Sequence, residues 1–265
     1  MVEVLDIGDR VETGSYRLHS RFHAALAFLH CASGSLACVV DESKVSGPIH
    51  IRVRGVDLTA VESLAVTDRT VCVDGVSVDP GQRYDSQVRP IPIGPKRLRR
   101  NLQVLCAVLR DDAPARSLAF LVRKPAATAG FKGELERRFL TGVERLVSGD
   151  LAGVDAIRGL GPGLTPGGDD FLAGYLLGLY ALGESDVRRE VAARAASGNP
   201  FSAAMLRCAA EGRSIEPARS LIEAMFDGGQ ADSMPYHAHR LLAVGASSGA
   251  DMATGIYFSL HSRVA

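Results

Sequence analysis

The sequence lacks the excess of one charge that marks several classes of protein. Its 265 residues carry 30 basic and 30 acidic side chains, so the formal net charge at pH 7 is zero. Proteins that bind nucleic acid or anionic membranes usually carry an excess of positive charge. We therefore expect neither nucleic acid nor a membrane as a partner.

Long apolar runs and paired cysteines are missing as well. The longest apolar run, Phe171 to Leu182, is too short to cross a bilayer and contains glycine. No secretory signal is visible. The five cysteines are scattered without a Cys-x-x-Cys pair, which favours reduced thiols over a disulfide scaffold or a zinc site. We expect a cytoplasmic protein.

The two parts of the chain differ in the spacing of their apolar residues. Before Pro95, alternation with a period of two predicts strands, and the Asp74-Gly75 pair between valines predicts a hairpin. The expected strands are Ala27 to Cys31, Leu36 to Val40, Ile49 to Val53 and the two arms of a hairpin over Val71 to Val78. The segment that begins at Leu18 stays ambiguous.

After Pro95, three-and-four spacing predicts helices. They are expected at Lys96 to Leu109, Leu135 to Val147, Phe171 to Leu182, Val187 to Ala196, Ser202 to Ala210, Pro217 to Phe226, Tyr236 to Val244 and Asp251 to Leu260. The fold class is therefore predicted to be α+β. A small β-rich domain, residues 1–95, is expected to pack on an α-helical domain, residues 96–265.

The most informative segment is Gly159 to Gly174, which contains six glycines and two prolines. Thr165 and Pro166 are typical of a helix start, with Thr165 as the cap and Pro166 as the first helical residue. The amides and the positive dipole end of such a start suit a phosphate or a carboxylate. A purely structural role for the glycines, in helix packing, stays open. The candidate binding residues here are Gly161, Gly163, Thr165, Gly167, Gly168 and the preceding Arg158.

A Gly-x-Asp-x-x-x-Gly pattern occurs twice. The first copy is Gly168 to Gly174, and the second is Gly249 to Gly255. Hydroxyl residues precede both copies, namely Thr165 in the first and Ser247 and Ser248 in the second. If the copies are a structural repeat, we expect two helix starts to converge on one anion.

Asp169 and Asp170 follow the glycines directly. Neighbouring residues on a helix point about 100° apart, so these two carboxylates do not grip one ion from the same face. Asp170 is the candidate to hold a Mg²⁺ ion that also touches a phosphate, because Mg²⁺ prefers few carboxylates together with ligand oxygens and water. The alternative is that both aspartates only complement the helix dipole.

The glycine-rich segment resembles the AllH-like family, whose pattern runs Gly-Leu-Gly-Pro-Gly-Leu-Thr-Pro, a small residue, Gly-Asp-Asp, two large apolar residues and glycine. Gly159 to Gly174 carries this pattern in full. His19-Ser20-x-Phe22 resembles the family's early His-Ser segment, and Gly245 to Asp251 resembles its Gly-His-Ser-Ser-Gly segment. Two positions depart from the family: Ala246 replaces a histidine, and Gly198 to Ser202 replaces a threonine-rich segment.

The resemblance implies a subunit of an oxamate carbamoyltransferase of anaerobic allantoin breakdown, a route of purine degradation. The implied reaction converts oxalurate and phosphate to oxamate and carbamoyl phosphate, in a complex with other subunits. With the resemblance, Asp169 and Asp170 become candidate catalytic residues. Candidate substrate-binding residues are then the glycine loop with Thr165, and Ser247, Ser248, Asp251, His19, Ser20 and Ser202.

Two hypotheses follow for the whole chain. In the first it is an enzyme subunit of a carbamoyl- or acyl-transfer complex that binds a small anionic substrate. In the second it is a non-catalytic scaffold subunit, which binds an anion or a CoA-type ligand for an acyl-transfer or carboxylase-like complex. Turnover by the isolated chain distinguishes them.

Overall fold

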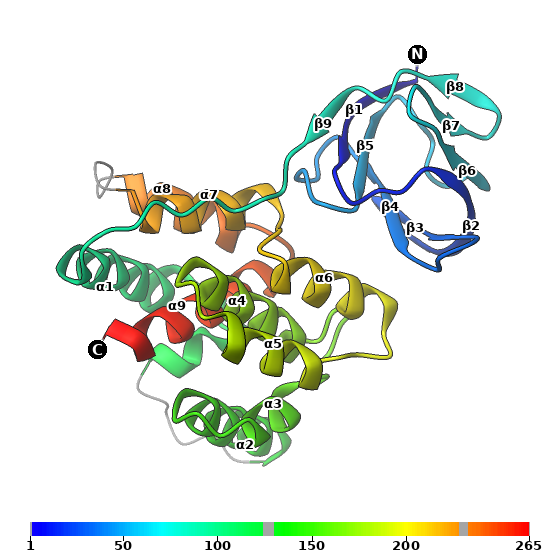
Figure 1. Cartoon of the computed structure of the whole chain (residues 1–265). Coiled ribbons are helices and arrows are strands. Elements are labelled where there is room, and N and C mark those ends of the chain that lie inside the picture. The colour runs from blue at the N-terminus through cyan, green and yellow to red at the C-terminus, as the bar shows by residue number, and fades with distance from the viewer. Residues whose placement is uncertain (1, 124–129, 228–232, 265) are drawn as a thin grey trace. The chain divides into compact units, whose positions relative to one another are not determined.

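The computed structural model describes residues 2–123, 130–227 and 233–264. The chain forms two compact units, Met1–Ser86 and Gln87–Ala265. Among the described residues, the strands belong to the first unit and the helices to the second (Figure 1). The predicted α+β class is confirmed. The division falls after Ser86, and the first helix begins at Pro95.

The first unit is one curled sheet of nine strands. Their order across the sheet is β8-β7-β6-β2-β3-β4-β5-β1-β9, and β4–β5 and β1–β9 pair in parallel. Buried side chains such as Leu26, Phe28, Val39 and Ile51 fill its core. The strands are β1 (Glu3–Gly8), β2 (Gly14–Phe22), β3 (Ala25–His30), β4 (Leu36–Asp41), β5 (His50–Arg54), β6 (Ser63–Val66), β7 (Val71–Val73), β8 (Val76–Val78) and β9 (Gln82–Tyr84).

The predicted strands and the hairpin are all present. The hairpin joins β7 and β8 through Asp74 and Gly75, which both have positive φ (48° and 79°). Such a turn matches the twist of the two strands and favours an Asp-Gly pair. The ambiguous segment from Leu18 is the end of β2 followed by β3. The strands β1, β6 and β9 were not predicted; β6 and β9 have only four and three residues, which carry little periodicity.

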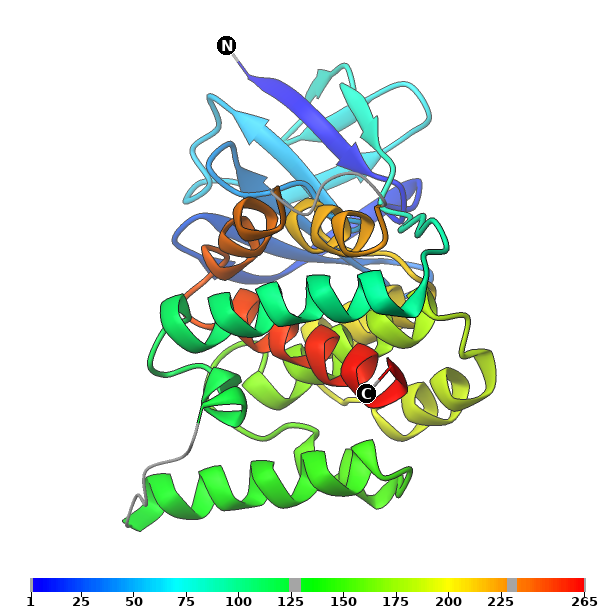
Figure 2. The same cartoon turned by 90° about the vertical axis from the view of Figure 1, so that its left-hand side faces the viewer.

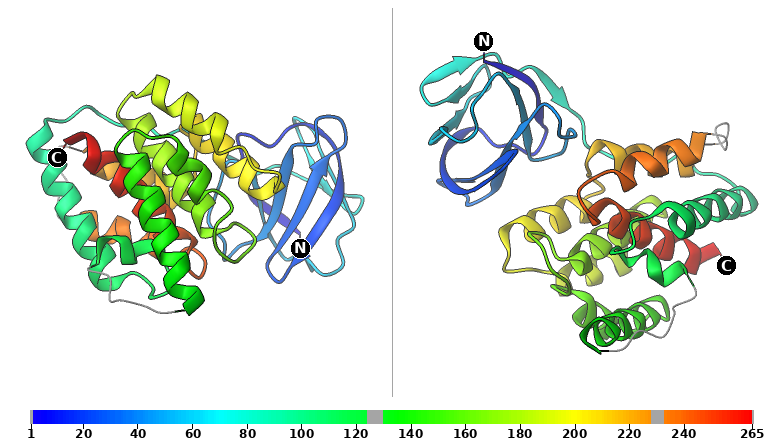
Figure 3. Two further views of the ribbon diagram at one scale, coloured as in Figure 1. Left: turned by 90° about the horizontal axis from the view of Figure 1, so that it is seen from below. Right: turned by 180° about the vertical axis from the view of Figure 1, so that it is seen from behind.

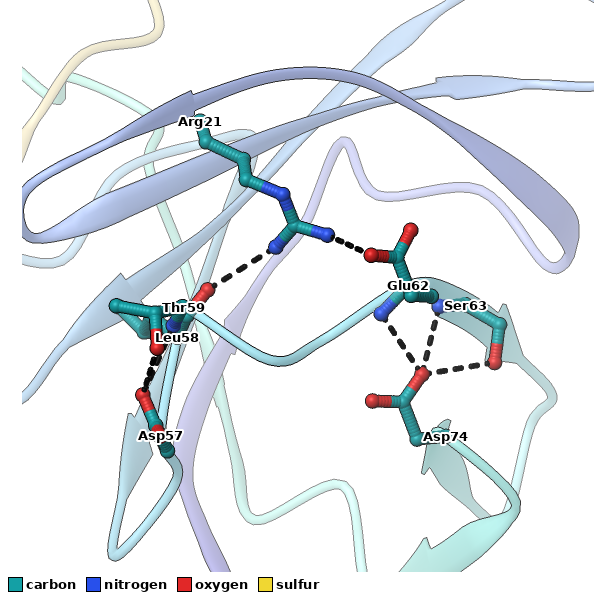
Figure 4. A network of polar contacts seen from close by, with 7 residues as sticks. All are labelled: Arg21, Asp57, Leu58, Thr59, Glu62, Ser63 and Asp74. Carbon is teal, nitrogen blue, oxygen red and sulfur yellow. Dashed lines mark hydrogen bonds and ion pairs between the residues drawn. The ribbon is translucent and has the colours of Figure 1, made fainter.

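A network of polar contacts ties that hairpin to the rest of the sheet (Figure 4). One carboxylate oxygen of Asp74 accepts hydrogen bonds from the amides of Glu62 (2.9 Å) and Ser63 (2.7 Å) and from the Ser63 hydroxyl (3.1 Å). Arg21 on β2 pairs with Glu62 and donates to the Leu58 carbonyl oxygen at 3.3 Å. The Asp74 side chain therefore fixes the start of β6.

We expect Asp74→Ala to lower the free energy of unfolding of the first unit by about 0.5–1.5 kcal/mol, because two exposed backbone amides exchange their carboxylate acceptor for water. Asp74→Asn keeps an acceptor oxygen and tolerates positive φ, so it should retain most of the stability. Denaturant unfolding of the wild type and of the two Asp74 variants tests this expectation. Equal losses in the alanine and asparagine variants would contradict it.

The second unit is helical. Helices α1 (teal) and α9 (red) pack together across the unit (Figure 2), and α2 pairs with α3 at one side (Figure 3). Its elements are α1 (Pro95–Asp112), the 3₁₀ turn η1 (Leu118–Val122), α2 (Gly130–Val147), α3 (Ala152–Ile157), α4 (Gly167–Ala181), α5 (Ser185–Arg194), α6 (Pro200–Ala210), α7 (Glu216–Met225), α8 (Met234–Leu242) and α9 (Ser248–Val264). Every predicted helix is present, whereas the short elements α3 and η1 were not predicted.

Helix α4 is the most deeply buried element of this unit. Every residue from Gly168 to Leu179 is buried, as its continuous apolar sequence predicted. It packs closely against α9, where glycines let the two backbones touch. A Cβ atom on Gly174 would overlap the Met252 carbonyl oxygen, and one on Gly255 would overlap the Phe171 carbonyl oxygen. The glycines are therefore required where α4 and α9 cross.

The composition predicted a chain without a membrane-spanning run and with reduced cysteines. No helix in the described ranges combines the length and apolar character needed to span a membrane. All five cysteines are free thiols.

Candidate functional site

Helices α4 and α9 run in the same direction, so their starts lie at the same end. Gly174 faces Met252 on α9, and Gly178, which lies further along α4, faces Ser259, which lies further along α9. The two Gly-x-Asp copies also make matching contacts: Gly174 faces Met252 just as Gly255 faces Phe171. Each facing residue occupies the same place in its own copy, so the sequence repeat is also a repeat of structure.

A third helix start lies at the same end. Asn199 caps α6 through the amide of Phe201 (2.9 Å), and its side-chain amide donates to the Leu164 carbonyl oxygen at 2.7 Å. Just beyond the other end of α6, Gly212 lies against the ring of Tyr180, near the end of α4. The glycine loop therefore lies at the starts of α4, α6 and α9, where the positive ends of three helix dipoles gather.

A cavity of about 770 Å³ opens at these starts. The glycine loop, the segment before α9, η1 with its preceding residues, and α2 all contribute to its lining. The expectation that both Gly-x-Asp helix starts face a shared pocket is confirmed. The lining residues include Gly161, Pro162, Gly163, Leu164, Thr165, Gly167, Ala246, Ser247, Ser248, Asp251, Arg116, Phe120, Leu135, Glu136 and Phe139.

Asp170 lies behind the hydroxyl groups of this cavity. It is 2 % exposed, and it accepts hydrogen bonds from the Thr165 hydroxyl (3.3 Å) and from Ser248 of the neighbouring helix. Burial raises the pKa of Asp170 to about 8, and the charges of Asp251 and Asp169 add to the rise. Asp170 is therefore mostly protonated at neutral pH.

Asp251 is the matching residue of the second copy, and it lines the cavity. One carboxylate oxygen accepts the Leu118 amide at 2.6 Å, which ties the start of η1 to α9. Burial raises the pKa of Asp251 to about 6, although hydrogen bonds from the Leu118 amide and Ser247 oppose the rise. The other oxygen lies so close to Gly167 that a Cβ atom there would be 3.0 Å away.

Asp169 holds the beginning of the glycine loop. One carboxylate oxygen accepts the Gly159 amide at 2.7 Å. The other is buried without a hydrogen-bond partner among the described residues, and so is the hydroxyl of Ser202 in the first turn of α6. Gly168, Asp169, Asp170 and Ser202 are not among the described residues that line the cavity. Their roles in binding and catalysis stay predictions.

The predicted capping role of Thr165 is wrong. Pro166 occupies the N-cap position of α4, and no side chain caps this helix. The extended backbone of Pro166 (ψ 142°) places Thr165 one residue too early, and its hydroxyl bonds to the Asp170 side chain instead. The amides of Gly168, Asp169 and Asp170 already donate to backbone carbonyls. Backbone amides thus supply less of an anion site than the sequence suggested.

Arg116, and not Arg158, is the arginine at the cavity. Arg158 donates to the Arg194 carbonyl oxygen at 3.0 Å and is absent from the described lining. Arg116 is exposed and lines the cavity. Sequence reasoning missed Arg116 because it is far from the glycine loop in the chain and reaches the cavity only through the fold around η1.

His19 and Ser20 belong to β2 of the first unit. Their side chains lie 3.0 Å apart, between His19 Nδ1 and Ser20 Oγ. The described lining of the cavity comes entirely from the second unit. A substrate role for His19 and Ser20 stays a prediction.

A bound magnesium ion needs several oxygen ligands, which carboxylates, other ligand oxygens and water supply. Among the described residues, no three His, Cys, Asp or Glu side chains gather as a metal site. The carboxyl groups of Asp170 and Asp251 already accept hydrogen bonds from Thr165, Ser248, Leu118 and Ser247. These observations do not point to a metal, and a Mg²⁺ ion at Asp170 stays a prediction.

Comparison with known proteins gives one family match. Residues 157–260 match the family model described as oxamate carbamoyltransferase subunit AllH. No curated protein and no solved structure matches the chain. The matched segment contains the glycine loop and both Gly-x-Asp helix starts, whereas His19, Ser20 and Arg116 lie outside it. Over residues 157–260, this chain is therefore similar to the AllH family.

Proposed function

We propose that this chain is a subunit of an oxamate carbamoyltransferase-like complex and that the cavity at the starts of α4 and α9 binds its small anionic substrates. In the proposed reaction, a phosphate oxygen attacks the carbamoyl carbon of oxalurate. The new C–O bond forms, the C–N bond breaks, and the proton of hydrogen phosphate ends on the nitrogen of oxamate. The products are oxamate and carbamoyl phosphate.

The observation that carries the proposal is the convergence of two matched helix starts on one cavity that contains an arginine. Parallel helices α4 and α9 direct their positive dipole ends toward it, and Arg116 lines it. A guanidinium group binds carboxylates and phosphates through paired hydrogen bonds. Dipoles and donors fixed in advance stabilise an oxyanion without reorganisation.

The two buried aspartates fit such a site in different protonation states. Asp170, with a pKa of about 8, is mostly uncharged at neutral pH and does not repel an anion. Its proton lets it donate to the Thr165 or Ser248 oxygen, so that this hydroxyl can direct its own hydrogen toward the ligand. Asp251, with a pKa of about 6, is the acceptor for an amide N–H of the substrate.

Isothermal titration calorimetry tests the site, with the chain in complex with its partner subunits. Phosphate, oxamate and carbamoyl phosphate are titrated with and without Mg²⁺. We expect Arg116→Ala to weaken binding by about tenfold to a hundredfold, because a hydrogen bond to a charged group contributes about 1.5–3 kcal/mol. Gly163→Val should weaken binding too, because Gly163 has a φ of 115° that valine does not adopt without strain.

Arg158→Ala is the matched control, since Arg158 is also exposed but does not belong to the described lining. Its affinity for each anion should equal that of the wild type. If neither the wild-type complex nor the isolated chain binds any of the three anions, the proposed function is wrong. Turnover by the isolated chain would favour the enzyme hypothesis over the scaffold hypothesis.

A further inference from the structure

The cavity is larger than its proposed ligands require. It encloses about 770 Å³, a volume typical of sites for drug-sized ligands. Oxamate and phosphate are much smaller, with only a few non-hydrogen atoms each. Oxamate and phosphate together leave a large part of the cavity volume unfilled. Water or a further chemical group has to occupy this part.

The described lining also carries no excess of basic side chains over acidic ones. Arg116 is the basic residue among the described lining residues, and Asp251 among them is acidic. Oxalurate and hydrogen phosphate together bring three further negative charges. An anion that leaves water for a protein cavity needs compensating positive charge. The charge of this lining therefore complements a basic group that enters together with the anions.

Apolar side chains border this polar centre. Phe120 comes from η1, Leu135 and Phe139 come from α2, and Pro162 and Leu164 come from the glycine loop. Leu164 is 44 % exposed although it is a large apolar side chain. Pro162 beside it is exposed as well, and neighbouring apolar residues that are exposed next to polar ones are typical of a surface that another protein covers.

We propose that the mouth of this cavity is an interface, and that a segment of a partner subunit inserts an arginine or lysine side chain there to complete the site. Apolar residues beside that side chain would pack on Leu164 and its apolar neighbours in the lining. This inference rests on the proposed function, because the negative charge is counted for the proposed reactants. Arginine is enriched at the centres of protein interfaces, where its stem packs and its head forms paired hydrogen bonds.

Photocrosslinking in the purified complex tests the interface. A benzoylphenylalanine replaces Leu164, and in a control protein it replaces Tyr236 on α8, which is 62 % exposed and lies outside the described lining. We expect the probe in place of Leu164 to link to one partner subunit, at a peptide that carries an arginine or lysine beside apolar residues. The probe in place of Tyr236 should not link to that peptide.

A second measurement links the interface to the site. Substitution of the crosslinked basic residue by glutamine should weaken oxamate binding to the complex at least tenfold, while the complex stays assembled in size-exclusion chromatography. The isolated chain should bind oxamate more weakly than the complex.

Three outcomes would overturn the inference while leaving the proposed function intact. The probe in place of Leu164 forms no link to a partner, the isolated chain binds oxamate and phosphate as tightly as the complex, or Mg²⁺ alone raises the affinity of the isolated chain to that of the complex. Absence of anion binding by the complex, together with a crosslink from the Leu164 position, would instead reject the proposed function and with it the role of the basic side chain.

Discussion

Gly174→Ala is expected to lower the free energy of unfolding of the helical unit by about 3 kcal/mol or more, at the upper end of what overpacking costs. A Cβ atom at Gly174 would overlap the Met252 carbonyl oxygen and lie 2.8 Å from its carbon. Both are backbone atoms, so the strain is relieved only if α4 and α9 move apart. Such a separation would also loosen the cavity at their starts.

Far-ultraviolet circular dichroism during denaturant unfolding measures this effect, because the described helices all belong to the second unit. Gly198→Ala is the matched control, since a Cβ atom at Gly198 would have no atom within 4 Å. Its stability should change by less than about 0.5 kcal/mol. Equal stabilities of the Gly174 and Gly198 variants would show that α4 and α9 do not cross as closely as described.

The stability of the helical unit is expected to fall as the pH rises from about 5 to about 8. The folded pKa of Asp170, about 8, lies above its ordinary value of 3.8, so the folded protein keeps a proton that the unfolded chain releases. The stabilisation from a raised pKa is fully present below the unfolded value and is lost as the pH rises through the folded value. The slope from one such group reaches about 1.4 kcal/mol per pH unit.

Asp170→Asn replaces the carboxyl group with a neutral group of similar shape. We expect it to flatten the dependence on pH between about 6 and 8 and to make the protein more stable than the wild type at about pH 8. Asp251→Asn should flatten only the lower part of the range, because the folded pKa of Asp251 is about 6. Denaturant unfolding at a series of pH values tests both expectations. If the slope of the free energy of unfolding against pH between about 6 and 8 is unchanged in Asp170→Asn, the raised pKa does not belong to Asp170.

Much of the fold follows from local sequence. The period of apolar residues separates strands from helices, because one face of each element has to be buried. The Asp74-Gly75 turn was predictable since its positive φ angles favour those two residues. The cap of α4 was not predictable, because the sequence allows either Thr165 or Pro166 to occupy the N-cap position. The structure places Pro166 at the N-cap, and Thr165 bonds to Asp170.

The candidate site was predictable only in part. The sequence alone determined the α+β class, the glycine loop and the repeated Gly-x-Asp helix starts, because these depend on residues close together in the chain. Only the tertiary structure decided that the two starts are parallel neighbours, that Arg116 and not Arg158 lines the cavity, and that Asp170 is deeply buried. The physical reason is that burial, charge proximity and pKa depend on contacts between distant segments, such as Asp251 with the Leu118 amide, and no local pattern of residues specifies them.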